Sequence, residues 1–385
     1  MEKTIKLYDK DSHMYEFSAR VISCVKSDKG FETVLDRTAF FPEGGGQSAD
    51  EGTINGIRVT DVQIDKNGII THTLETELPA GTEVKGETDR ELRFRRMQNH
   101  TGEHIVSGII HRLFGYNNVG FHMGSECVTL DLDGPLTRDD LDRVEMLANR
   151  AVCENVAVRA EYPSAEVLEN LDYRSKLDLT ENVRIVTIEG YDVCACCAPH
   201  VDRTGEIGVI KLLDAIRYKG GTRINMLSGY DALEDYNARY KSTAAVSVLL
   251  KSKQSEIKEA VERILEELNS EKQAQTELKK KLIRLKKASI QPTDGNLVLF
   301  EESMDMLNLR ILVNETIELC GGICAAFSGN DADGYSYVIA SKTVPMRAKS
   351  KEINSALCGR GGGSDEMIQG SVKASAEEIK AYFEV

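Results

Sequence analysis

Hydrophobic and polar residues alternate in short runs along residues 1–90. Residues 33–35 and 69–74 are two such runs, and the turn sequence at residues 66–68 precedes the second. Alternation with a period of two predicts half-buried strands, and Asn-Gly marks a turn between them. Residues 1–90 are therefore expected to form a β-rich unit.

The periodicity changes after Arg93. Ile105, Ile109 and Leu113 recur at intervals of four residues, which predicts a helix over residues 96–113. A second amphipathic helix is predicted over residues 138–152. Strands are predicted over residues 183–193 and 208–213. Helices mixed with strands indicate an α+β domain in residues 91–234.

A heptad stripe is the clearest pattern of the region between residues 235 and 290. Its apolar members recur at alternating spacings of three and four: Leu250, Ile257, Val261, Ile264, Leu268, Leu278, Leu282 and Leu285. Glu271 and Gln275 interrupt the stripe at two core positions. A long helix or coiled coil is expected here, either folded back on itself or paired between chains. Residues 291–385 follow as a small α/β domain.

Size and charge limit the class of protein. A chain of 385 residues is too long for one ordinary core, which agrees with several domains. No run approaches the roughly 20 apolar residues that cross a bilayer, and the N-terminus lacks the apolar core of a secretory signal. We therefore expect a cytoplasmic protein. Because the net charge is −14, any binding of nucleic acid would depend on local basic clusters.

Histidine and cysteine occur in two pairs with the same spacing. His100 and His104 are four residues apart, so a helix would place them one turn apart on one face. Cys196 and His200 repeat that spacing far downstream. Three imidazoles and one thiolate form a borderline-soft, tetrahedral donor set that suits zinc. The pattern predicts one Zn²⁺ per chain, held by these four residues.

Three of the nine cysteines crowd at Cys194, Cys196 and Cys197. In a long chain without an export signal, such crowding suggests metal binding or redox chemistry before disulfides. Cys194 and Cys197 are therefore competing ligands, ranked below Cys196. Glu103 directly precedes the second histidine, whereas the glutamate of the zincin motif directly follows the first.

Three motifs resemble those of a known family. The sequence RMQNHTGEH at residues 96–104 resembles the H-x-x-x-H helix of alanyl-tRNA synthetase editing domains, and more closely that of the free-standing alanyl-tRNA editing proteins (the AlaX family). The sequence CCAPHVDRTGEIG at residues 196–208 resembles the family's C-x-x-x-H and T-G-E-I-G. The sequence FPEGGGQ at residues 41–47 is similar to its P-x-G-G-G-Q loop. The motifs occur in family order.

The resemblance implies an α+β fold of four parts. These are an N-terminal β-barrel (1–90), a zinc-dependent editing domain (91–234), a long helical hairpin or coiled coil (235–290) and a small C-terminal α/β domain that binds tRNA (291–385). The implied activity is hydrolysis of the ester in alanine tRNA mischarged with serine, with glycine as a second candidate. Because no aminoacylation domain precedes the barrel, the expected enzyme edits in trans. The family resemblance also implies nucleotide or ATP binding.

Three further side chains are candidates for catalysis or amino-acid binding. Thr101 and Gln98 lie near the ligands on the same helix, with a capping or solvent-facing role as the alternative. His122 occupies a region where the synthetases have a Gln-containing pocket strand. The metal is expected either to polarise a water or to hold the substrate's amino group, and the sequence leaves both roles open.

Local basic clusters are the candidates for tRNA contacts. They comprise Lys279, Lys280, Lys281, Arg284, Lys349 and Arg360. The alternative interpretation of any one cluster is a solvent-exposed helix face that does not contact tRNA. A homodimer through the helical hairpin or the C-terminal domain is expected.

Three alternative functions stay open. The first is a deacylase for another tRNA, such as threonine tRNA, because threonyl-tRNA synthetases contain a related domain. The second is a non-catalytic tRNA-binding or dimerisation module in which zinc only stabilises the fold, so that zinc removal would unfold it. The third is a thiol-redox protein built on residues 194–197.

Overall fold

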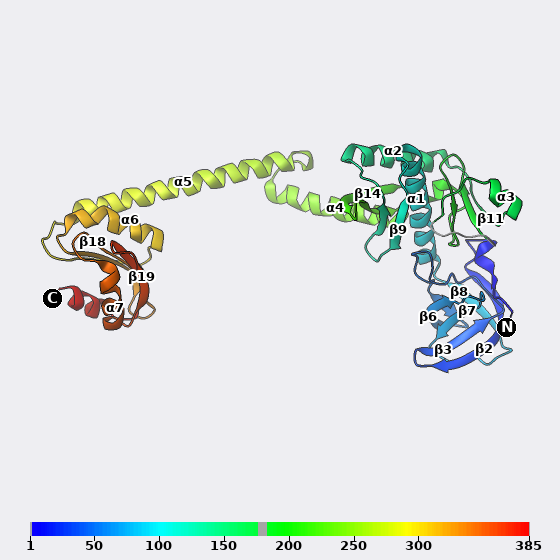
Figure 1. The fold of residues 1–385 in the computed structure, drawn as a ribbon, viewed down its shortest axis with the longest axis horizontal. Helices are drawn as coiled ribbons and strands as arrows, with labels where there is room; N and C mark the ends of the chain where they lie inside the picture. The colour runs from blue at the N-terminus through cyan, green and yellow to red at the C-terminus, as the bar shows by residue number, and fades with distance from the viewer. Residues whose placement is uncertain (1, 176–182, 385) are drawn as a thin grey trace. The chain divides into compact units, whose positions relative to one another are not determined.

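The computed structural model describes residues 2–175 and 183–384. The chain forms two compact units, Met1–Ala245 and Val246–Val385, whose elements are labelled in Figure 1. No helix in the described ranges is long and apolar enough to cross a membrane.

A closed six-stranded barrel begins the first unit, with the strand order β2-β3-β7-β6-β5-β8. The strands are β2 (Glu16–Ser27), β3 (Gly30–Leu35), β5 (Gly52–Ile54), β6 (Ile57–Ile64), β7 (Ile70–Leu74) and β8 (Glu83–Thr88). A short parallel pair, β1 (Ile5–Lys6) and β4 (Arg37–Thr38), accompanies them, and the 3₁₀ turn η1 (Leu7–Asp9) follows β1. Alternate residues of β2 and β8 point into the barrel core, as alternation predicts.

Helix α1 (Arg90–Phe114) follows the barrel directly. Asp89 caps it by accepting a hydrogen bond from the Leu92 amide, and Gly115, with φ 73°, ends it. The helix packs on a four-stranded antiparallel sheet of order β14-β15-β10-β9. Gly102 permits this close packing, because a Cβ at that position would collide with Ser228 Oγ. The elements are β9 (Asn118–Met123), β10 (Val128–Leu132), α2 (Arg138–Glu154), β14 (Ile210–Tyr218) and β15 (Gly221–Ser228).

A smaller antiparallel sheet, β11-β12-β13, leads to the second ligand pair. Its elements are β11 (Val158–Glu161), α3 (Ala165–Asn170), β12 (Ile185–Ile188), β13 (Asp192–Ala195) and η2 (Thr204–Ile207). The sequence predicted one strand over residues 183–193, but the structure has a hairpin there. Gly190, with φ 78°, lets the chain turn between β12 and β13.

Two helices occupy the region of the heptad stripe. They are α4 (Gly229–Leu250) and α5 (Ile257–Ser289), separated by η3 (Gln254–Glu256). Apart from half-buried Ile257, the stripe on α5 is exposed, from 39% at Val261 to 72% at Leu285. Ile283, which is not in the stripe, is buried against α6. The coiled coil therefore stays a prediction.

The second unit ends in a mixed five-stranded sheet of order β16-β17-β18-β20-β19. Its elements are β16 (Leu297–Glu301), α6 (Met306–Thr316), η4 (Ile317–Leu319), β17 (Ile323–Asn330), β18 (Gly334–Ser341), α7 (Met346–Ala356), β19 (Arg360–Gly363), β20 (Met367–Val372) and α8 (Ala376–Phe383). Alternation along β17 places Phe327 in a core with α7 and α8, and Ala326 in a core with α6. The helices thus cover both faces of the sheet (Figure 1), and the predicted α+β fold with an N-terminal barrel is confirmed.

Candidate metal centre

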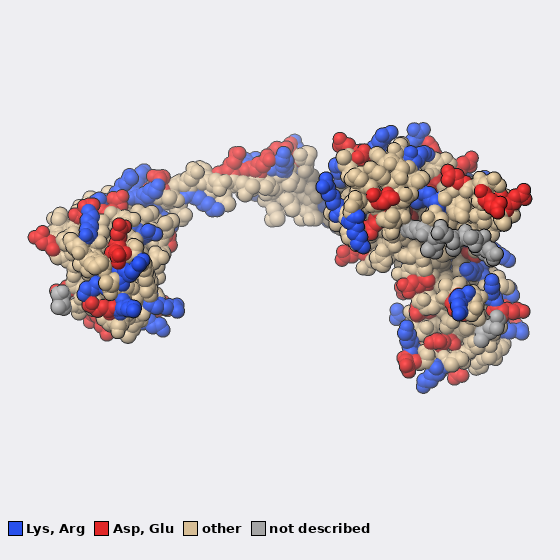
Figure 2. All heavy atoms as spheres, viewed as in Figure 1, with Lys and Arg blue, Asp and Glu red and all other residues tan. Residues whose placement is uncertain are grey.

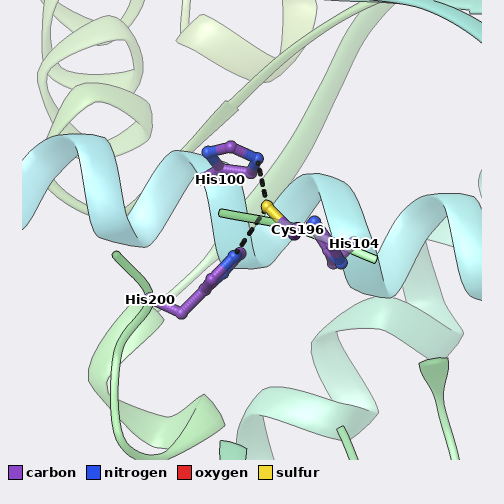
Figure 3. Close-up of side chains that lie close together, drawn as sticks. All are labelled: His100, His104, Cys196 and His200. Carbon is purple, nitrogen blue, oxygen red and sulfur yellow. Dashed lines mark hydrogen bonds between the residues drawn. The ribbon is translucent and has the colours of Figure 1, made fainter. Parts of the chain in front are cut away.

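The structure brings the two predicted ligand pairs together. One donor atom from each of His100, His104, Cys196 and His200 lies within 4.8 Å of all the others. Figure 3 shows the imidazoles of His100 and His200 pointing at the sulfur of Cys196. The distances to Cys196 Sγ are 3.5 Å from His100 Nε2 and 3.4 Å from His200 Nε2. Each histidine is 3% exposed.

Each histidine is oriented by a second partner on its other ring nitrogen. Gln47 Oε1 lies 2.8 Å from Nδ1 of His100, and Thr101 Oγ1 lies 3.1 Å from Nδ1 of His200. Asp192 Oδ2 lies 3.0 Å from Nδ1 of His104. Such partners fix the ring and leave Nε2 for a metal, an arrangement typical of metal-binding histidines.

Asp192 belongs to a buried ion pair that the sequence analysis missed. Arg174 donates from Nε to Asp192 Oδ1 at 2.7 Å and from its terminal nitrogen to Oδ2 at 2.8 Å. Burial alone would raise the pKa of Asp192, but the hydrogen bonds from His104 and Arg174 hold it below its ordinary value. Neither residue lies in a His or Cys motif, so spacing gave no signal for them.

The protonation states favour Cys196 over its neighbours as a ligand. Burial alone would raise the pKa of Cys196, but nearby His100 and His200 lower it well below its ordinary value. Burial lowers the pKa of His200 to about 3 and raises that of Cys194 to about 11. A thiolate and a neutral imidazole are the forms that bind a metal. Burial alone would lower the pKa of His104, but Cys194 and Asp192 raise it well above its ordinary value, so a metal would have to displace the proton of that ring. The donor set therefore fits Zn²⁺, and Cys194 and Cys197, whose pKa burial also raises, suit it less.

A cavity of about 860 Å³ opens beside the four ligands. His100, His104 and Cys196 line it, so three of the candidate ligands border space that a small molecule can occupy. The Phe121 ring, centred 4.8 Å from that of His100, forms an apolar part of its wall. The basic side chains of Lys6, Arg112, Arg174 and Arg184 also line the cavity.

The glycine-rich loop connects the barrel to this cavity. Gly45 and Gly46 adopt φ values of 62° and 85°, which L-residues with a Cβ rarely adopt. A Cβ on Gly46 would also collide with the Phe121 carbonyl oxygen. The loop can therefore lie against β9 and present Gln47 to His100.

The three candidates for catalysis or amino-acid binding have different surroundings. Thr101 is fully buried and contacts His200, and its hydroxyl also accepts a hydrogen bond from the Val201 amide. Gln98 donates to the Glu206 carbonyl oxygen and accepts from the Tyr230 amide, so it anchors α1. His122 is exposed on β9. Neither Gln98 nor His122 lines the cavity, and their contact with substrate stays a prediction.

Three of the six predicted tRNA-binding cations have acidic partners. Lys279 lies 3.3 Å from Asp305, Lys280 lies 2.8 Å from Glu277, and Lys349 lies 2.8 Å from Glu352. Lys281, Arg284 and Arg360 form no ion pair with any described residue. Figure 2 shows basic and acidic side chains interspersed on the visible face of the second unit.

Comparison with known proteins identifies related sequences along most of the chain. Residues 6–92 match the family "tRNA synthetases class II (A)". Residues 183–230 match the "Threonyl and Alanyl tRNA synthetase second additional domain". The alanine–tRNA ligase of Methanococcus vannielii is 30% identical over 99% of this chain, and that of Ignicoccus hospitalis is 31% identical over 73%. The chain spans only 43% and 32% of the length of these two ligases.

One relative matches the chain over nearly the full length of both. The alanyl-tRNA editing protein AlaX-L of Pyrococcus horikoshii is 29% identical over 97% of this chain and 96% of its own length. A crystal structure of the C-Ala domain of Aquifex aeolicus alanyl-tRNA synthetase is 24% identical over 23% of this chain and 87% of its own, with a TM-score of 0.20. The match to AlaX-L, over nearly the full length of both proteins, confirms the resemblance to the long alanyl-tRNA editing proteins that the motifs indicated.

Proposed function

We propose that the protein is a Zn²⁺-dependent deacylase that hydrolyses seryl-tRNA(Ala) in trans, with glycyl-tRNA(Ala) as a second candidate substrate. The observation that carries the proposal is the convergence of three oriented imidazoles and a thiol beside a cavity, which His100, His104 and Cys196 line. A purely structural zinc site has no need of a cavity, whereas a reaction site needs an accessible position beside its metal.

The proposed metal ligands are His100, His104, Cys196 and His200. When bound, Zn²⁺ would supply a Lewis acid beside the ester or its attacking water. The protein's own contribution is to hold the ligands: Gln47, Thr101 and Asp192 keep the three imidazoles oriented. The reaction adds water to the ester carbonyl carbon and breaks its bond to the ribose oxygen, releasing serine and tRNA.

We expect selectivity against alanine to depend on polar groups that contact the amino-acid side chain. The serine hydroxyl can satisfy a polar group that the methyl group of alanine would leave unpaired, and this difference favours serine strongly. Glycine needs a steric explanation because it is smaller than alanine. Thr101 is proposed to act through His200 rather than on the substrate directly, because its hydroxyl contacts His200 and the Val201 amide.

The proposed partner is tRNA(Ala), held through the second unit. Lys281, Arg284 and Arg360 are the stronger candidates, because no described acidic residue pairs with them. The exposed apolar stripe on α5 supports a homodimer in solution. Each unpaired cation that meets a phosphate would add to the salt dependence of binding.

The test compares release of the amino acid from seryl-tRNA(Ala) and alanyl-tRNA(Ala) by the full chain. A His100→Ala/His104→Ala double variant, shown by circular dichroism to be folded, is assayed in parallel. We expect fast release of serine, slow release of alanine and loss of activity in the variant. No hydrolysis above the spontaneous rate, with tRNA binding intact, would instead support the non-catalytic module. Deacylation of another mischarged tRNA would identify a different substrate.

A further inference from the structure

Glu103 is a buried carboxylate that the proposed metal site does not use. It is 3% exposed and lines the same cavity as His100 and His104. Its Oε1 accepts hydrogen bonds from the Ser107 hydroxyl and from Asn118 Nδ2, the latter at 2.6 Å. Glu103 is not one of the four clustered candidate ligands. The sequence pattern singled it out only by its position before His104.

Among residues 2–175 and 183–384, no cation lies within ion-pair distance of Glu103; Arg174, which pairs with Asp192, interacts with Glu103 only at longer range. The other two buried carboxylates of this region are paired, Asp50 with Arg93 and Asp192 with Arg174. Glu103 receives hydrogen bonds only from neutral donors, Ser107 and Asn118, and both bind the same oxygen. A buried carboxylate without an ion-pair partner is costly. On the cavity wall, Glu103 is therefore positioned to accept a hydrogen bond from a cationic ligand.

We propose that Glu103 binds the α-ammonium group of the aminoacyl ester. This inference rests on the proposed function and assigns one contact of its substrate. The α-ammonium is the cationic group one bond away from the carbon that bears the reacting carbonyl, so it must lie close to the metal ligands when the ester does. Glu103 lies three residues after His100, which places both side chains on one face of α1.

Two consequences follow from this contact. Serine, glycine and alanine esters all carry the ammonium, so Glu103 favours charged over uncharged or N-blocked tRNA without selecting the amino acid. The ammonium is then held by the protein rather than by Zn²⁺, which leaves the metal to act on the ester or on water.

The experiment removes the charge from each side of the contact. Seryl-tRNA(Ala) is compared with its deaminated counterpart, the 2,3-dihydroxypropanoyl ester, in which a hydroxyl replaces the ammonium. We expect the unmodified protein to prefer the seryl ester by roughly 10- to 100-fold, the range for a charge-assisted hydrogen bond. Glu103→Gln should slow the seryl ester by that factor and leave the deaminated ester nearly unchanged. Glu91→Gln, on the exposed first turn of α1, is the matched control.

Several outcomes would overturn the proposal. Equal slowing of both esters by Glu103→Gln would assign the carboxylate to a step common to both, such as proton transfer from water. A preference for the seryl ester that survives in the variant would assign the ammonium to another group. If Glu103→Gln hydrolysed both esters at the rates of the unmodified protein, a contact between Glu103 and the ammonium group would be excluded.

Binding measurements separate this inference from the proposed function. Two tRNAs carrying amide-linked, non-hydrolysable versions of the same acyl groups are titrated into the full chain, and zinc content is measured on each variant. A preference for the amino form that Glu103→Gln abolishes supports the contact even if neither ester is hydrolysed. If Glu103→Gln loses zinc, Glu103→Asp is tested instead, because aspartate keeps the carboxylate. This variant should keep the preference for the amino form. Loss of that preference in a variant that retains zinc would contradict the proposal.

Discussion

Asp192 and His104 form a buried pair in which the carboxylate oxygen Oδ2 lies 3.0 Å from the ring nitrogen Nδ1. Asp192 is the first residue of β13 in the small sheet, whereas His104 is in the middle of α1. The small sheet therefore supplies the carboxylate that orients the imidazole of His104. Arg174 holds the carboxylate in turn. The orientation of His104 therefore depends on residues far from it in sequence.

Asp192→Asn is expected to weaken zinc binding. The amide keeps the shape of the side chain but removes the charge that orients His104. Loss of such a partner lowers metal affinity by about 10- to 100-fold, which competition with a chromophoric chelator would measure. Asp131→Asn is the control, because Asp131 pairs with Arg223 across β10 and β15. Unchanged zinc affinity in Asp192→Asn would show that the carboxylate does not support the ligand.

Thr101→Val tests the support of His200. Valine matches the shape of threonine but cannot hydrogen-bond to Nδ1 of His200 or to the Val201 amide, so we expect zinc affinity to fall by about tenfold. Thr101→Ser keeps the hydroxyl and should bind zinc like the unmodified protein. If the valine variant kept its zinc affinity but lost only hydrolysis, Thr101 would act on substrate rather than through His200.

His72 predicts a pH dependence of stability in the barrel. Burial lowers its pKa to about 4, while the unfolded chain has an ordinary histidine with a pKa of 6.5. Between these values the unfolded state binds the proton and the folded state does not. The free energy of unfolding therefore decreases as the pH falls from 6.5 toward 4, by about 3 kcal/mol in total.

Urea unfolding at a series of pH values in this window would measure the effect. His72→Gln should lose this part of the pH dependence, whatever its stability at neutral pH. His111→Gln, at an exposed position on α1, is the control and should retain it. Parallel pH profiles for His72→Gln and the unmodified protein would contradict the assignment.

Binding of tRNA is expected to depend more on unpaired than on paired cations. Arg360→Ala should lower the affinity for tRNA(Ala) and reduce the slope of log affinity against log salt by about 1, the change for one lost phosphate contact. Lys349→Ala should have a smaller effect, because Lys349 pairs with Glu352. Filter binding at several salt concentrations would measure both. Equal effects of the two variants would contradict this distinction.

The sequence predicted the elements whose signal is local. Helix periodicity indicated most of α1, and the repeated spacing of four identified His100 with His104 and Cys196 with His200 as candidate ligands. A spacing of four on a helix determines a shared face, so the first pair needed no tertiary structure. Cys196 and His200 lie outside any helix, between β13 and η2, and only the repeated spacing indicated them.

The surroundings of the ligands could not be predicted in the same way. The pairing of Asp192 with His104 depends on a β-hairpin where one strand was expected, and Gly190 was the signal that was missed. Gln98 lies near the ligands in sequence, but helix geometry turns it toward η2 and the start of α4. Asp305, the acidic partner of Lys279, is 26 residues away in sequence, so the basic cluster gave no sign of it. The pair of Lys349 with Glu352 is local, at a spacing of three on one helix, and was a signal that was missed.

The central claim is that His100, His104, Cys196 and His200 form the reaction centre. Stepwise reconstitution with zinc tests this claim most directly. The full chain is depleted of metal with a chelator, and the single-turnover rate of serine release from seryl-tRNA(Ala) is measured as Zn²⁺ is added back. We predict that the rate rises in proportion to bound zinc up to one ion per chain, while far-ultraviolet circular dichroism shows the metal-free chain to be folded. A folded, metal-free protein that releases serine at the full rate would contradict the claim.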